Sequence, residues 1–152
     1  MSLQQQITND IKTSMKARDK QRTSALRMVL ASMKNAAVAA GRGPQGELSD
    51  DEVVKLLQTE TKRRKEAAAA YRDAGRDEQA AGEEAEATIY EAYLPAQLSD
   101  DELASLVDEA IAEAGADNPS QMGQVMKAVM PKVAGRADGS LVSGMVKDRL
   151  GG

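Results

Sequence analysis

The chain has 152 residues and a mass of 16.2 kDa, which suits one domain or two small ones and excludes a multidomain synthetase. Its formal net charge of −4 argues against a uniformly basic nucleic-acid coat. Because Cys and His are absent, disulfides, thiolate or imidazole metal sites and Cys–His or Ser–His nucleophiles are excluded, and we expect no cofactor or metal.

The core should be thin. Leu, Ile, Val and Phe together number only 26, so 26 Ala and eight Met must complete it. The first residues show no basic segment followed by an apolar run, and no stretch approaches the roughly 18 consecutive apolar residues of a membrane span. We therefore expect a cytoplasmic protein without a membrane partner.

Apolar residues at helical spacing predict two helices before a Gly- and Pro-rich loop at 41–46. The first helix should bury a face with residues four apart, and the second should bury a wider one. These apolar faces are Leu3, Ile7, Ile11 and Met15 in the first helix, and Leu26, Val29, Leu30, Met33 and Ala37 in the second.

A third helix should begin at Ser49, which is an N-cap residue with Glu52 placed to complete a capping box. It should run from about residue 50 to 74, with polar residues interrupting its apolar side. A fourth helix should extend to Leu94, with the acidic run 83–86 on a solvated face. Its expected apolar side is Ala81, Ala85, Ile89 and Tyr93.

Pro95 ends the fourth helix, because proline disfavours a helical residue before it. A second N-cap, at Ser99, begins the first of three short amphipathic helices. None of these helices can bury its apolar side alone. No segment alternates as a strand does. The sequence therefore predicts an all-α protein with an N-terminal helical bundle or hairpin, residues 1–95, followed by a small three-helix domain, residues 96–152.

The turn Gly135-Arg136-Ala137-Asp138-Gly139 is Gly-rich but lacks the Lys-Ser/Thr ending of a nucleotide-binding loop. Its structural interpretation is that Gly135 closes one helix in a left-handed conformation and Asp138 caps the next. Its functional interpretation is close approach to a backbone phosphate. The acidic clusters at 50–52 and 100–102 are explained by the positive end of the helix dipole.

Two basic regions stand out in this acidic chain. Residues 12–34 hold seven Lys or Arg and one acidic residue, whereas residues 120–150 hold five bases after an acidic stretch, 99–117, with no base. A solvated face explains the first region more readily than the second, which lies beside the Gly-rich turn. A third, shorter basic cluster at 62–65 points to different sides of its helix, so it is the weakest of the three candidates. The candidate RNA-binding residues are Lys127, Lys132, Arg136 and Lys147, with Gly135 and Gly139.

Several short motifs follow one another along the chain in a specific order and spacing. They are Leu26-Arg27-Met28, Tyr71 to Arg76, Tyr93-Leu94-Pro95, Gln97-Leu98-Ser99, Met122-Gly123, Val125-Met126-Lys127, and the turn 135–139 followed by Val142, Val146-Lys147 and Leu150. Together these motifs resemble the YqeY-like proteins, which are related to the tail domain of the B subunit of tRNA-dependent amidotransferases (GatB).

The resemblance implies a two-part helical fold and an accessory role in holding tRNA. It also implies the family label of carbon–nitrogen ligase activity with glutamine as amido-N-donor. We expect no intrinsic catalysis, because this chain has no room for the catalytic cradle domain and no visible glutaminase nucleophile. Sparse aromatic residues favour recognition of RNA by shape and backbone.

The alternative hypothesis is a protein-interaction module that docks on an amidotransferase or another translation enzyme without contacting RNA. It depends on Met122, Met126 and Met130, since methionine adapts to partner surfaces. The same residues are explained more simply as core filling. Exposure of Met130 discriminates between these interpretations, because it lies off the apolar stripe of its helix.

Overall fold

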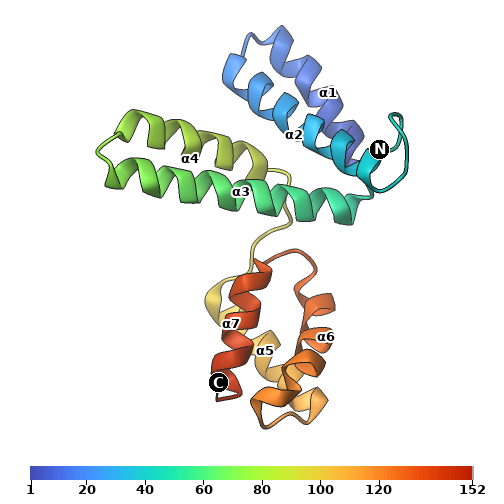
Figure 1. Cartoon of the computed structure of the whole chain (residues 1–152), viewed down its shortest axis with the longest axis vertical. Coiled ribbons are helices and arrows are strands. Elements are labelled where there is room, and N and C mark those ends of the chain that lie inside the picture. The colour runs from blue at the N-terminus through green and yellow to red at the C-terminus, as the bar shows by residue number, and fades with distance from the viewer. Residues whose placement is uncertain (152) are drawn as a thin grey trace. The chain divides into compact units, whose positions relative to one another are not determined.

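The computed structural model describes residues 1–151, and within that range the protein is all-α, as the sequence predicts (Figure 1). The chain divides into two compact units, of which the first is Met1–Leu94 and the second begins at Pro95. In the described part of the chain, no helix combines the length and the apolar character needed to cross a membrane.

The N-terminal unit consists of two helical hairpins. The first pairs α1 (Leu3–Lys16) with α2 (Lys20–Ala39), and the second pairs α3 (Asp50–Asp73) with α4 (Asp77–Glu91). Figure 1 shows the first hairpin, in blue, packed across the second, in green. Because α2 contacts both α3 and α4, one side of α2 is committed to the core.

The buried face of α1 differs from the predicted one. Met15 is 50% exposed, and the buried line is instead Gln4, Ile7, Ile11 and Ser14. Residues exactly four apart advance about 40° around a helix at each step, so a strict four-residue stripe rotates out of the core. The buried Ser14 hydroxyl is satisfied by a 2.7 Å hydrogen bond to the Thr23 hydroxyl of α2.

The predicted apolar side of α4 is correct only in part, because Ile89 and Tyr93 are half-buried against the core but the fully buried residues are others. Ala80, Ala87 and Tyr90 are buried, whereas Ala81 is exposed. The turn of α4 between these buried residues carries Glu83 and Glu86, which face α3 instead of lying on a solvated surface. Their partner on α3 is described below.

The capping box at the start of α3 is confirmed. The Ser49 hydroxyl accepts a hydrogen bond from the Glu52 backbone N–H at 3.3 Å, and the Glu52 carboxylate accepts one from the Ser49 N–H at 3.1 Å. Leu48 and Val53, on either side of the cap, both lie in the hydrophobic core. The cap therefore sets where α3 enters the unit.

Replacing Ser49 with Ala should lower the free energy of unfolding by about 1 kcal/mol, because the Glu52 N–H loses its acceptor. Urea denaturation followed by circular dichroism measures the change. Ser49→Asp retains an N-cap acceptor and should remain within about 0.5 kcal/mol of wild type. Equal losses in the two variants would contradict the capping assignment.

The second unit is a three-helix bundle of α5 (Asp100–Ala114), α6 (Met122–Val133) and α7 (Gly139–Arg149), with a short 3₁₀ turn, η1 (Pro119–Gln121), before α6. Its core is made mainly of aliphatic side chains from all three helices. These buried residues are Leu103, Val107, Ala110, Val125, Val129, Val133, Ala137, Val142, Val146 and Leu150.

The turn between α6 and α7 has the predicted structural role. Gly135 has a φ of +77°, in the left-handed region, and Asp138 is the N-cap of α7, accepting from the Ser140 N–H at 2.9 Å. Ala134 before it is also left-handed, with a φ of +49°. Two successive left-handed residues let the chain reverse within five positions.

Candidate nucleic-acid interface

Two of the four candidate cations in the second unit are engaged within the fold. The Lys132 ammonium bridges two carboxylates of α5, Glu113 at 2.9 Å and Glu109 at 3.1 Å. Hydrogen bonds to Glu113 and then to Glu109 raise the pKa of Lys132. The charge of this ammonium is therefore offset within the fold by two carboxylates of α5.

Arg136 closes the end of α6. Its guanidinium donates to the backbone carbonyl of Lys132 at 3.1 Å and to that of Val133 at 3.3 Å, both of which lie in the last turn of the helix. Its own carbonyl accepts from the Leu98 N–H at 2.8 Å. Gly135 and Gly139 lie on either side of this anchored residue, and Gly139 is exposed.

The other two candidates, Lys127 on α6 and Lys147 on α7, are exposed and make no ion pair within 4 Å with any residue from 1 to 151. The nearby Arg149 is paired with Asp108 at 2.6 Å. From residue 95 onward the sequence holds five Lys or Arg and nine Asp or Glu. The second unit is thus acidic, with two exposed unpaired lysines on different helices.

The first hairpin of the N-terminal unit is strongly cationic. Residues 1–46 hold eight Lys or Arg and two acidic residues. Six of these cations are exposed and form no ion pair with any residue that the structure describes. They are Lys12, Lys16, Arg18, Lys20, Arg27 and Lys34.

Three of the six lie along one side of α2. Lys20, Arg27 and Lys34 are seven residues apart, which returns each to nearly the same side of the helix, with a rise of about 10 Å between neighbours. The side of α2 that packs in the core carries Leu26, Met33 and other buried residues. We call the three exposed cations the α2 basic line.

An open groove of about 540 Å³ lies beside this line, where α1 ends and α2 begins. It combines cations with exposed methionines, and none of its lining residues in the described part of the chain is acidic. The lining residues are Met15, Arg18, Lys20, Thr23, Ser24, Arg27 and Met28. The sequence pattern predicts the basic cluster but not this groove, because it places Met15, which is half-exposed, in the core.

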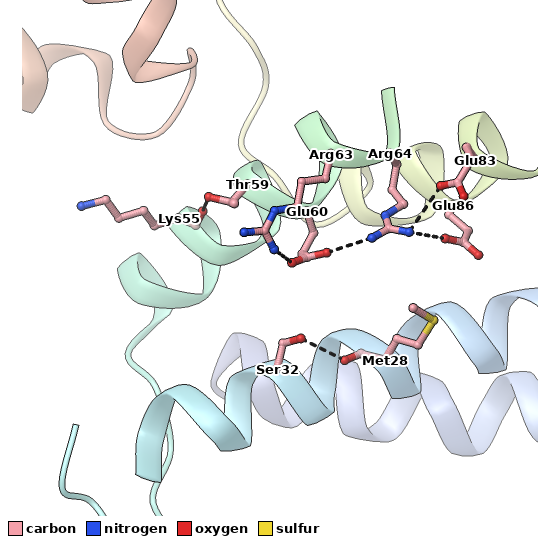
Figure 2. Close-up of polar contacts among 9 residues, drawn as sticks. All are labelled: Met28, Ser32, Lys55, Thr59, Glu60, Arg63, Arg64, Glu83 and Glu86. Carbon is pink, nitrogen blue, oxygen red and sulfur yellow. Dashed lines mark hydrogen bonds and ion pairs between the residues drawn. The ribbon is translucent and has the colours of Figure 1, made fainter. Parts of the chain in front are cut away.

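A third charged feature lies between α3 and α4, in the part of the unit that faces α2 (Figure 2). Arg64 of α3 extends between three carboxylates, contacting Glu83 at 3.3 Å, Glu60 at 3.5 Å and Glu86 at 3.7 Å. All four side chains are less than a quarter exposed. We call these residues the Arg64 cluster.

Burial, followed by the charge of Glu83, raises the pKa of Glu86. Burial is also the main reason that the pKa of Tyr90, deeper in the same unit, is raised to about 12. Within residues 1–151 no group of three or more acidic residues is arranged to hold a metal ion. Because the Arg64 guanidinium contacts carboxylates of both α3 and α4, the Arg64 cluster is best explained as a structural contact that stabilises this hairpin.

A family model described as Yqey-like protein matches residues 4–150, which is nearly the whole chain. No curated protein matches the sequence.

Proposed function

The chain belongs to the YqeY-like protein family, and from this premise we propose that it is a non-catalytic accessory protein that binds folded RNA, tRNA in particular. The observation that carries the proposal is the set of six exposed, unpaired cations on α1, on α2 and in the turn between them. The α2 basic line is the most regularly spaced part of this set.

The contrast with other cations of the chain supports this proposal. Arg42, Arg64, Arg72, Lys132 and Arg149 all meet carboxylates in the fold. A cation paired in this way has little charge to offer to a phosphate, whereas an unpaired one releases counterions when phosphate binds. The first hairpin is therefore the stronger candidate surface, and Lys127 and Lys147 of the second unit are the secondary candidates.

The proposal is tested by measuring the affinity for tRNA as a function of salt concentration. Changing Lys20, Arg27 and Lys34 together to Gln should weaken binding and make the slope of log K against log salt shallower by about 1 for each lost phosphate contact. The changed side chains are exposed, so circular dichroism should remain that of wild type.

Two further variants locate the contacts. The pair Lys127→Gln and Lys147→Gln should flatten the slope if the second unit also contacts RNA. Lys132→Gln is the matched control, because its ammonium is occupied by Glu109 and Glu113, and its slope should equal that of wild type. Undetectable binding at ~50 mM salt, where phosphate contacts are strong, would refute RNA binding.

A second candidate function is docking on a translation enzyme through the methionines of α6. Met122 and Met126 pack against the core of the second unit, which fits their simpler interpretation as core filling. Met130 is 38% exposed and so remains available to a partner. Capture from cell extract, with RNA and protein identified separately, distinguishes docking from RNA binding. Met130→Ala should abolish capture of the protein partner and leave capture of RNA unchanged.

A further inference from the structure

The groove between α1 and α2 has a mixed chemistry that the α2 basic line alone does not explain. Phosphate binding requires cations, yet half-exposed Met15 and Met28 place apolar thioethers among Arg18, Lys20 and Arg27. A ligand that uses both kinds of side chain carries anionic groups and an apolar surface, and a nucleotide, with its phosphate and the faces of its base, has both. The volume of the groove, about 540 Å³, lies in the range typical of sites for small molecules or cofactors.

We propose that this groove receives one unpaired nucleotide of the bound RNA. The base packs against Met15 and Met28, since sulfur makes favourable contacts with aromatic rings, and the Arg27 guanidinium lies against its face. The phosphates on either side pair with Arg18 and Lys20. This inference rests on the proposed RNA binding and names the form of RNA that the site selects.

The position of Arg27 supports the assignment. One of its terminal nitrogens, Nη2, lies 3.3 Å from the Met15 sulfur, so the side chain reaches from α2 to the end of α1. Within residues 1–151, no carboxylate forms an ion pair with it. A guanidinium oriented by a thioether keeps its full charge and most of its donors for a ligand.

The backbone of Arg18 gives independent support. Its φ is +57°, in the left-handed region, at the position after α1 where Gly is most common. An L-residue with a long side chain is strained in this conformation. A cation is therefore present where Gly would fold more easily, which is understandable if its charge is used for binding.

The apolar part of the groove favours a base over a peptide helix. An amphipathic helix docks through anchors at i, i+3 or i+4, and i+7, which need a row of apolar side chains along the groove. Here the large apolar lining consists of two methionines, and the remaining side chains are polar or charged. Two methionines and one guanidinium can cover one ring, and the Ser24 hydroxyl is available to its polar edge.

The test uses two stem-loop RNAs that differ by one unpaired adenosine bulged from the stem. Wild-type protein should bind the bulged RNA about 3- to 10-fold more tightly than the fully paired one. The double variant M15A/M28A should lose this preference while keeping the wild-type salt slope, because it removes no charge. V38A is the matched control, since Val38 is an exposed apolar residue of α2 outside the groove, and it should keep the preference.

Charge variants separate general RNA binding from binding of the unpaired nucleotide in the groove. K34Q, outside the groove, should weaken binding of both RNAs equally, whereas R18G should weaken binding of the bulged RNA more. R18G also relieves the left-handed backbone, so it should fold at least as well as wild type.

The failures are distinguishable. Equal affinity of the wild type for both RNAs would overturn the nucleotide site and leave RNA binding in place. Loss of binding to both RNAs at ~50 mM salt would overturn RNA binding and this inference with it. If an acidic amphipathic peptide bound wild type but not M15A/M28A, and the bulge conferred no preference, the groove would be a protein-docking site and the inference would be wrong.

Discussion

Replacing Arg64 with Ala should lower the free energy of unfolding of the N-terminal unit by about 3 kcal/mol, the largest loss expected from any single charge in this protein. Glu60, Glu83 and Glu86 would then face one another without the cation that separates them. Each is about a fifth exposed, so water compensates only in part. Urea denaturation followed by tyrosine emission measures the change, because all three Tyr lie in this unit.

Arg63→Ala is the matched control. Arg63 is the neighbouring residue and contacts the same Glu60 at 3.0 Å, but its side chain is 64% exposed. An exposed ion pair of this kind contributes little, so the loss should stay below about 1 kcal/mol. Equal losses from the two variants would show that the Arg64 cluster does not hold the hairpin.

The loss in Arg64→Ala should also depend on pH. The folded-state pKa of Glu86 is already raised above its ordinary value of 4.5, so the protonated form favours the fold, and that stability is lost as the pH rises through the folded pKa. Without Arg64 the carboxylates repel more strongly and this pKa should rise further. Lowering the pH from 7 toward 5 should therefore recover part of the deficit of the variant.

Glu52 does not interfere in this range. Its hydrogen bond to Arg42, followed by the Ser49 N–H, lowers its pKa to about 2, so its contribution is lost only as the pH falls from 4.5 toward 2. A deficit that stayed constant between pH 7 and pH 5 would contradict the role assigned to Glu86.

Tyr90→Ala should cost about 3–5 kcal/mol, because Tyr90 is 1% exposed and its ring fills the core where α4 meets α2. Its hydroxyl donates to the Ala25 backbone carbonyl at 2.8 Å. Tyr90→Phe retains the ring and removes this donor, so it should cost about 1–2 kcal/mol. The difference between the two variants separates packing from hydrogen bonding.

Tyr71→Phe is the matched control on α3. Tyr71 is only half-buried and has no hydrogen bond through its hydroxyl among the described residues, so the change should stay within about 0.5 kcal/mol. Circular dichroism follows all three variants, since it does not depend on the tyrosines. A Tyr90→Phe loss no larger than that of Tyr71→Phe would contradict the α4–α2 hydrogen bond.

The two stability predictions bear on the candidate interface through α2. Tyr90 and the crossing of the two hairpins hold one side of α2 in the core. This packing fixes which residues of α2 are exposed. When Leu26 and Met33 are buried, the exposed side of the helix carries Lys20, Arg27 and Lys34, which share one side because they are seven residues apart. The order of the α2 basic line therefore depends on the packing beneath it.

Local patterns predicted the helices and several of their ends, although α4 ends at Glu91 and not at the predicted Leu94. The Ser49 capping box, the Asp138 cap and the left-handed Gly135 depend on neighbours within a few residues, so the sequence contains all the information that they need. The all-α class follows from the same periodicity. The family resemblance drew on the order of short motifs, and the matching family model extends over residues 4–150.

Charge pairing between distant residues could not be predicted in the same way. The sequence placed Lys132 and Arg136 in an RNA-binding set, but one meets Glu109 and Glu113 and the other closes α6. It also placed the acidic run 83–86 in solvent, whereas Arg64 of α3 contacts two residues of this run, Glu83 and Glu86. A single sequence shows which charges exist, but only packing brings distant charges within a few ångströms.

The amino-acid order thus specified the helical class, the caps and the supply of cations, because each arises from interactions along one turn of helix or from composition. Which cations stay exposed, which side of α1 is buried and where Met15 meets Arg27 were decided by the way the hairpins pack. Those contacts join residues many positions apart, and their energies depend on burial and distance, which a linear pattern does not contain.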